Sequence, residues 1–292
     1  MEKTILNSAH LGSYIDITLP GFPSRKPHPE PCRIHTLEMG EGEPLLLVHS
    51  IGQSIYTWRA LMPKLSERYR VIAVDLPGFG HSDRPVSLNY SMDEMSDVLL
   101  KIVDALGLSK THLLGMGAGG LYVMHALSKA PDRFLKVIAL TPTGITKQMP
   151  KKVRRMEGAF GFFARESFSK KDFLRDLPLF YYDGTICTEQ VVDQYYLTSD
   201  DFASRQAIMY AIRNLDEDAV RASIAHCTHE LLVLWGEEDR MAPLDLLFSL
   251  KEYIPNGVYH SIRNAGHHLH EEKAEVLSEV IDRYICYQGD AS

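Results

Sequence analysis

The chain has 292 residues, 45% of them hydrophobic, and a formal net charge of -7, a composition typical of an ordinary globular protein. The acidic balance argues against a nucleic-acid partner, because binding to phosphates needs a basic face. No apolar run reaches the roughly 18 residues of a membrane span, and residues 1–7 lack a signal-peptide pattern, so we predict a cytoplasmic protein with no membrane partner.

The patterns along the chain predict an α/β fold in which a central sheet is interrupted by one insertion. Residues 1–31 are predicted to be an irregular leader because prolines crowd their second half, although the alternating residues 14–19 could form an edge strand. Residues 32–143 alternate apolar strand-like runs with amphipathic segments, including a predicted helix over residues 92–106. This alternation predicts a mostly parallel central sheet with helices on both faces. Strand patterns resume near residue 229, so residues 229–292 are assigned to the same core.

The intervening residues 144–228 differ in composition and show no glycine-terminated strand pattern, which predicts a helical insertion. Aromatic residues and three methionines favour a largely apolar surface, the methionines being Met149, Met156 and Met209. A basic cluster opens the insertion, and it could meet a carboxylate or an acidic carrier protein. A solvated helix face is the simpler interpretation of this cluster, which comprises Lys147, Lys151, Lys152, Arg154 and Arg155.

Five segments carry motifs that resemble those of the α/β-hydrolase superfamily, and they occur in that family's order. Residues 44–52 resemble the oxyanion-loop strand and its H-G-x-G turn, and residues 71–83 resemble the D-x-P-G-x-G-x-S segment. Residues 115–119 read G-M-G-A-G and resemble the nucleophile elbow G-x-S-x-G. Residues 231–239 resemble the late strand that ends in the catalytic acid, and residues 264–272 resemble the loop that carries the catalytic histidine. The resemblance implies the α/β-hydrolase fold, with residues 144–228 as a helical cap over the active site.

The resemblance also implies site roles for individual residues. Asp239 would orient His267 and stabilise its imidazolium, as in a serine hydrolase. The backbone amides of Ile51 and Ala118 would form the oxyanion hole. Neighbouring residues that would contact the substrate are His49, Ser50 and Met116, and a structural role is expected for His268 and His270.

Gly117 occupies the position of the serine nucleophile, so the predicted site lacks the atom that attacks. Glycine relieves the backbone strain that a serine bears at such an elbow. Ser50 stands where the family usually has glycine and is a conceivable substitute nucleophile. Because the oxyanion loop faces the wrong side of the carbonyl, we expect instead that Ser50 fills space or bonds to the loop.

Three functions are compatible with this sequence. In the first, an atypical enzyme uses the His267–Asp239 dyad as a general acid and base, with an oxyanion hole, on a small, mostly apolar carbonyl or acyl compound. Its reaction would be that of a lyase, an isomerase or epimerase, a cyclase, or direct attack by water. In the second, an ordinary ester, thioester or lactone hydrolase is inactivated by the serine-to-glycine change at position 117. In the third, a hydrolase fold binds a ligand without chemistry.

No cofactor or metal site is predicted. The glycines after residue 115 lack the G-x-G-x-x-G spacing and the downstream acidic residue of a dinucleotide site. The cysteines are scattered without metal-ligand spacing, so we expect four free thiols: Cys32, Cys187, Cys227 and Cys286. The expected partner is a small-molecule substrate, and the sequence leaves the oligomeric state open.

Overall fold

The structure is a computed structural model, and it describes residues 12–20, 28–142, 169–225 and 229–287. Its centre is an eight-stranded sheet in the order β1-β2-β4-β3-β5-β6-β7-β8. The strands β2 to β8 cover Glu30–Met39, Pro44–Val48, Arg70–Val74, Thr111–Met116, Phe134–Leu140, Leu231–Gly236 and Val258–Ile262. The pairs from β4 to β8 are parallel, and β2 joins β4 antiparallel. The predicted fold class, a mostly parallel sheet with helices on both faces, is confirmed.

Strand β1 (Ser13–Leu19) pairs antiparallel with β2 and forms the sheet edge. The edge strand suggested by the alternating residues 14–19 is confirmed, so the leader of residues 1–31 is not irregular over this stretch. Their inward-facing Ile17 and Leu19 are buried, which fixes the register of the pair. Strand β2 also begins at Glu30, two residues before the predicted start of the core.

Both faces of the sheet are buried, because alternate residues of a strand belong to two different hydrophobic clusters. Along β3, Leu46 and Val48 join one hydrophobic cluster, whereas Leu45 and Leu47 join the other. This period of two follows from the strand pleat, and it explains why the central strands read as continuous apolar runs. The first cluster includes residues of α3 (Met92–Ala105), α4 (Ala118–Lys129) and α11 (Asp245–Tyr253), and the second includes α2 (Met62–Leu65) and α13 (Ala274–Cys286).

Short helices link these elements to the sheet. They are η2 (Ile55–Trp58) after β3, η3 (Pro131–Arg133) before β6 and α12 (Leu269–Glu272) before α13. Helix α3 begins with a capping box, in which Ser91 Oγ accepts from the Glu94 amide while the Glu94 carboxylate accepts from the Ser91 amide. This box explains why the helix predicted from residue 92 begins there.

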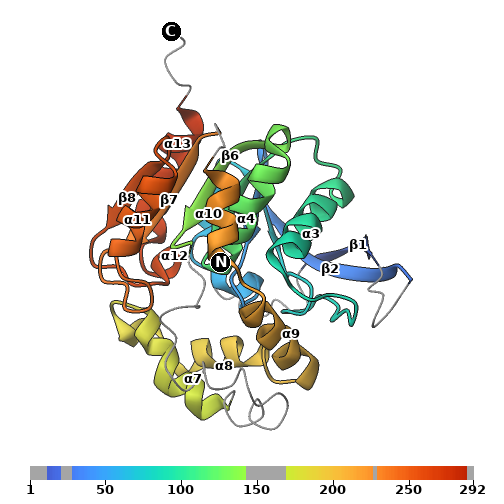
Figure 1. The fold of residues 1–292 in the computed structure, drawn as a ribbon. Coiled ribbons are helices and arrows are strands. Elements are labelled where there is room, and N and C mark those ends of the chain that lie inside the picture. Colours follow the sequence, from blue (N-terminus) through green and yellow to red (C-terminus); the bar gives the residue numbers. More distant parts are fainter. Residues whose placement is uncertain (1–11, 21–27, 143–168, 226–228, 288–292) are drawn as a thin grey trace.

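The insertion between β6 and β7 is helical wherever the structure describes it. Its helices are α7 (Lys170–Asp176), η5 (Leu177–Phe180), η6 (Gly184–Ile186), α8 (Glu189–Leu197), α9 (Phe202–Arg213) and α10 (Glu217–Ile224). Figure 1 shows α7, α8 and α9 gathered at one end of the sheet, apart from the helices that cover its faces. Met149, Met156 and the basic cluster of residues 147–155 lie outside the described residues, whereas Met209 is half-buried on α9.

Helix α10 packs against the helices of the sheet, unlike α7, α8 and α9. Its Val220 and Ile224 are buried in the first hydrophobic cluster, and the helix packs on α4. Helix α10 lies inside the predicted cap of residues 144–228, and its apolar face covers α4. An amphipathic pattern shows that a helix has an apolar face, but it does not show which element covers that face. The sequence therefore could not reveal that α10 packs on α4.

Candidate active site

The turn between β5 and α4 has the backbone of a nucleophile elbow. Gly117 has φ 56° and ψ −121°, a conformation that strains any residue with a Cβ. Gly115 and Gly119 allow the turn to pack closely, because a Cβ on Gly119 would collide with the carbonyl oxygens of Val48 and His49. The glycine-dense sequence is thus required by the close packing of the elbow against β3.

His267 and Asp239 form the dyad that the motifs predict. Asp239 Oδ2 accepts from His267 Nδ1 at 2.7 Å, and its Oδ1 accepts from the amides of Met241 and Ala242 at 2.8 Å each. The carboxylate side chain is fully buried, and three donors therefore hold its charged form in one orientation. Because Nδ1–H is committed to Asp239, the lone pair of His267 lies on Nε2.

His267 Nε2 faces the elbow. A Cβ built on Gly117 would lie 3.8 Å from this nitrogen, which would bring the hydroxyl of a serine at that position within hydrogen-bonding reach. From the cap side, the ring of Phe180 meets the His267 ring edge-on at a centroid distance of 5.6 Å. The dyad is therefore aimed at an elbow that carries no side chain.

The oxyanion loop differs from the prediction in one important contact. The amide of Ala118, predicted to be an oxyanion donor, donates to Ser50 Oγ at 3.1 Å. Among the described residues, none accepts a hydrogen bond from the amide of Ile51, the other predicted donor. The hydroxyl of Ser50 therefore bonds across to the elbow instead of within its own loop, and it does so on the donor that the substrate was expected to use.

Two of the predicted substrate contacts lie with their side chains inside the protein. The His49 ring is fully buried, donates from Nδ1 to the Ser50 carbonyl at 2.7 Å and accepts from the Leu76 amide at Nε2. Burial lowers the pKa of this imidazole, which keeps it neutral for these two bonds. Met116 is fully buried in the second hydrophobic cluster, because its alternation on β5 points it toward that core. In this structure both side chains are engaged inside the protein, and their role as substrate contacts stays a prediction.

A buried carboxylate beside the dyad was missed by the sequence analysis. Glu271 accepts hydrogen bonds from Arg59 at 2.5 Å, from Tyr181 at 2.6 Å and from Tyr195. Thr57 Oγ1 adds a contact at 3.3 Å. Burial would raise the pKa of Glu271, but chiefly the charge and the hydrogen bond of Arg59 hold it at about 2. Tyr181 follows η5, Tyr195 lies on α8 and Arg59 follows η2, so one charged group joins the insertion, the segment after β3 and the loop of His267.

The two histidines that follow His267 have the structural role expected of them. His268 Nε2 meets Gln53 Nε2 at 3.0 Å, and its ring stacks on Tyr195. His270 Nε2 contacts Thr57 Oγ1 at 2.7 Å. Burial lowers the pKa of His268 well below its usual range and that of His270 to about 4, so both rings are neutral at pH 7. In the sequence, only the adjacent Glu271 and Glu272 hinted at a buried charge here, and the partners of these histidines could not be predicted.

Glu272 is the glutamate of the G-H-x-x-H-x-E pattern that residues 266–272 resemble. Its carboxylate accepts from the amide of Gly266 at 2.7 Å and from the amide of the cap residue Asp183 at 3.1 Å. The first contact is to the backbone next to His267, and the second ties this loop to the insertion. The carboxylate therefore fixes the path of the histidine loop.

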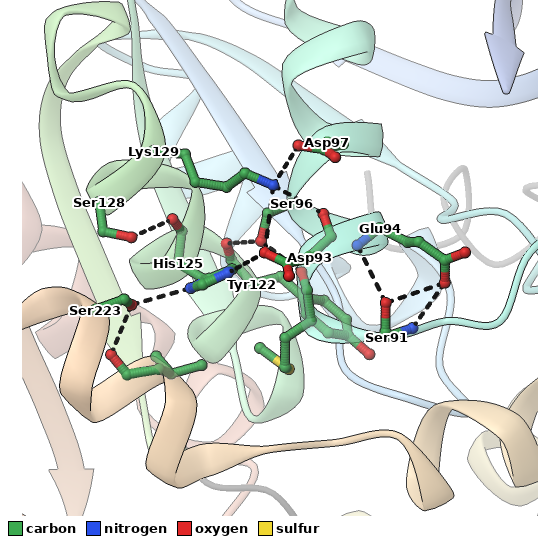
Figure 2. Close-up of polar contacts among 12 residues, drawn as sticks. Ser91, Asp93, Glu94, Ser96, Asp97, Tyr122, His125, Ser128, Lys129 and Ser223 are labelled. Atoms are coloured by element: carbon green, nitrogen blue, oxygen red, sulfur yellow. Dashed lines mark hydrogen bonds and ion pairs between the residues drawn. The ribbon is translucent and has the colours of Figure 1, made fainter. Parts of the chain in front are cut away.

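Outside the candidate site, a serine, a histidine and an aspartate form a chain of hydrogen bonds between helices (Figure 2). His125 contacts Ser223 Oγ at 3.0 Å through Nδ1 and Asp93 Oδ1 at 2.8 Å through Nε2. Ser223 Oγ also donates to the Val220 carbonyl at 2.9 Å, so its proton is committed, and the Asp93 side chain is 77% exposed. A hydroxyl without a free proton and a solvated acid make a poor triad. The chain instead ties α3, α4 and α10 together, which supports placing α10 with the core.

Among the residues that the structure describes, no group of three or more His, Cys, Asp or Glu side chains is arranged to hold a metal ion. Of the helices described, none has the length and apolar character needed to cross a membrane. The thiols of Cys32, Cys187 and Cys286 are free, as predicted, and Cys227 lies outside the described residues.

Comparison with known proteins agrees with this geometry. Residues 43–274 match the family model for the alpha/beta hydrolase fold. The chain is 26% identical to a 2-hydroxymuconate semialdehyde hydrolase of Pseudomonas sp. over 89% of this chain and 92% of that protein. It is 27% identical to an uncharacterized hydrolase, YugF, of Bacillus subtilis over 82% of this chain and 89% of that protein. Among solved structures, a meta-cleavage product hydrolase of Pseudomonas fluorescens matches with a TM-score of 0.72 and 25% identity, over 87% of this chain and 94% of that one. The chain therefore belongs to the α/β-hydrolase fold family, and its relatives include hydrolases of meta-cleavage products.

Proposed function

We propose that this protein is a general acid/base enzyme that acts on a small, mostly apolar carbonyl compound without forming an acyl-enzyme at the elbow. One observation carries the proposal: the His267–Asp239 pair is intact at 2.7 Å and its free nitrogen faces an elbow that has no side chain. A bare glycine cannot attack a carbonyl, but a buried, oriented imidazole remains a competent base. The dyad would contribute roughly 10²–10⁴-fold to the rate.

The path that a proton can take through His267 supports this role. His267 Nε2 can accept a proton from the substrate or from a water, and Asp239 stabilises the resulting imidazolium through Nδ1–H. The proton then returns from Nε2 to the product. No bond to the enzyme forms in this sequence, so the loss of the seryl oxygen does not interrupt it.

The names of the relatives suggest the substrate class. The 2-hydroxymuconate semialdehyde and 2-hydroxy-6-oxo-2,4-heptadienoate hydrolases are named for compounds that join a hydroxyl-bearing alkene to a carbonyl through a conjugated chain. Such compounds exchange protons between carbon and oxygen readily, which is the chemistry a base promotes. We therefore propose a conjugated, enolisable carbonyl compound as substrate, converted by tautomerisation or by addition of water and cleavage of a carbon–carbon bond.

The assignment of residues to a cap and a core is part of the same proposal. Residues 144–216 would form the cap, and α10 with residues 229–292 and 32–143 the core, because α10 packs on α4. The cap helix α9 contacts the oxyanion loop, since Ile208 lies within van der Waals distance of a Cβ on Gly52, and Thr198 Oγ1 donates to the Gly52 carbonyl at 2.6 Å. A cap that contacts the loop in this way would cover a small-molecule substrate.

The experiment compares the wild-type protein with His267→Ala and Asp239→Asn on conjugated hydroxy-oxo-dienoates, followed by the loss of their visible or ultraviolet absorbance. We expect wild-type turnover and a loss of about 10²–10⁴-fold in kcat in the variants. His260→Ala is the matched control, because that imidazole is exposed on β8.

The other functions appear as distinct outcomes. Full turnover by His267→Ala would reject the dyad as the base. Binding of the dienoates without turnover, measured by calorimetry, would favour either the ligand-binding protein or the hydrolase inactivated at position 117, and esterase activity in Gly117→Ser would identify the hydrolase. An initial burst of product from a p-nitrophenyl ester would indicate an acyl-enzyme and reject the proposal.

A further inference from the structure

We infer that the catalytic hydroxyl of this protein has moved from the elbow to the oxyanion loop: Ser50 O–H donates to the reacting oxygen of the substrate, and Gly117 is the residue that makes room for it. The inference rests on the proposed function for its chemistry, but the pairing of the two positions can be tested without any substrate.

The first evidence is steric. A Cβ on Gly117 would lie 2.6 Å from Ser50 Oγ and 3.1 Å from Ser50 Cβ. Real Cβ atoms do not approach another heavy atom to 2.6 Å, so a serine at position 117 would require the Ser50 side chain to move. The side chain of Ser50 therefore occupies part of the space that a residue at the elbow would need.

The second evidence is the way in which Ser50 is held. Its amide donates to Gln53 Oε1 at 3.0 Å, and its carbonyl accepts from His49 Nδ1 at 2.7 Å and from the Gln53 amide at 3.2 Å. Gln53 is in turn in contact with His268 at 3.0 Å. These bonds fix the backbone of the residue on both sides, and the hydrogen bond from the Ala118 amide orients its hydroxyl oxygen toward the elbow.

The third evidence is the hydrogen-bond state of the hydroxyl. Its oxygen accepts from the Ala118 amide at 3.1 Å, and no described residue accepts its proton. Ser50 is 9% exposed, at the elbow that His267 Nε2 faces. A hydroxyl that accepts from an amide becomes a better donor, because hydrogen bonds in a chain polarise one another.

The chemical consequence is a relayed oxyanion donor. His267 Nε2 removes a proton from the substrate, the electron pair moves onto the carbonyl oxygen, and Ser50 O–H donates to that oxygen while Ala118 N–H donates to Ser50 Oγ. When the proton returns from Nε2 to the substrate, the charge on oxygen is neutralised. Ser50 forms no covalent bond in this sequence, and no redox partner is needed.

The pairing is tested by a double-mutant cycle on thermal unfolding with the wild type, Gly117→Ser, Ser50→Gly and the double variant. Gly117→Ser introduces backbone strain in both backgrounds, so the cycle cancels that contribution and isolates the contact between the two positions. We expect Gly117→Ser to lower Tm clearly more when Ser50 is present than in the Ser50→Gly background. Equal shifts in the two backgrounds would overturn the steric argument.

A covalent probe gives a second, independent reading of the same pairing. A fluorophosphonate reacts with an activated serine beside a catalytic histidine. We expect the double variant to be labelled at position 117 at least ten times faster than Gly117→Ser alone, in which Ser50 still crowds the elbow. Equal labelling rates would contradict the inference, and labelling of the wild type at Ser50 would show that this hydroxyl is a nucleophile instead of a donor.

The donor role is tested with Ser50→Ala on the dienoate that the wild type converts. Removal of an oxyanion donor lowers kcat by about 10²–10³-fold, and we expect this loss with little change in KM. If Ser50→Ala retains kcat while His267→Ala abolishes it, the inference about Ser50 fails and the proposed function stands. If the wild type converts no dienoate, the proposed function and the donor role fail together, and only the pairing of positions 50 and 117 is left for the unfolding cycle to decide.

Discussion

The charge of Glu271 should stabilise the folded protein strongly at neutral pH, and the substitution Glu271→Gln measures that effect. The carboxylate is 1% exposed and receives hydrogen bonds from Arg59, Tyr181 and Tyr195. Glutamine keeps the shape of the side chain but leaves the guanidinium of Arg59, which is 13% exposed, without its counter-ion.

The magnitude follows from the pKa of Glu271, which falls from 4.5 to about 2 in the folded protein. Because each pKa unit corresponds to 1.36 kcal/mol, the charged form contributes about 3 kcal/mol to the free energy of unfolding. Truncation of one partner of a buried ion pair typically destabilises a protein by about 3–5 kcal/mol, in agreement with this value.

The sign of the pH dependence is fixed by the lowered pKa. The contribution is present in full above the ordinary pKa of 4.5, and it is lost as the pH falls through about 2. The difference in stability between the wild type and Glu271→Gln should therefore be largest at pH 7 and shrink steadily below pH 4.5.

The assay is urea denaturation at pH 7 and at pH 3, with Glu38→Gln as the control. Glu38 also binds an arginine, Arg70, but both side chains are over a third exposed, so the loss should stay below about 1 kcal/mol. If Glu271→Gln destabilises the protein no more than Glu38→Gln does, or if its effect does not depend on pH in this window, the reasoning is refuted.

Two further predictions concern the elbow and the cap. Gly119→Ala should destabilise the protein by roughly 3 kcal/mol or prevent folding, because its Cβ would meet the carbonyl oxygens of Val48 and His49. In the same urea titration Gly107→Ala should lose only about 1–2 kcal/mol, because Gly107 has φ 68° but no atom within 4 Å of its Cβ position. Equal losses in the two variants would contradict the packing argument. Tyr181→Phe removes one hydrogen-bond donor to the Glu271 carboxylate, so it should lower the free energy of unfolding by about 1.5–3 kcal/mol and speed proteolysis within the proposed cap. Tyr182→Phe, at an exposed ring, should change neither quantity. Similar behaviour of the two variants would mean that the hydrogen bond to Glu271 does not hold the cap.

The sequence by itself determined the fold class and the pairing of His267 with Asp239. Apolar runs that are buried on both faces, such as β3, leave a pattern that only a sheet covered on both sides explains, and short motifs at strand ends place Asp239 and His267 at one edge of that sheet. Local backbone demands are also visible in sequence, as in the glycines of the elbow and the capping box of α3. These features depend on neighbours in the chain or on strand order, which patterning records.

Tertiary structure alone decided which groups meet across long separations. Ser50 and Ala118 are 68 positions apart, and only the packing of the oxyanion loop on the elbow shows that the hydroxyl of one accepts from the amide of the other. The same holds for Glu271, whose charge is balanced by Arg59 from a segment 212 positions away. A hydrogen bond or an ion pair depends on distances of a few tenths of an ångström between such segments, and periodicity and composition carry no information at that scale.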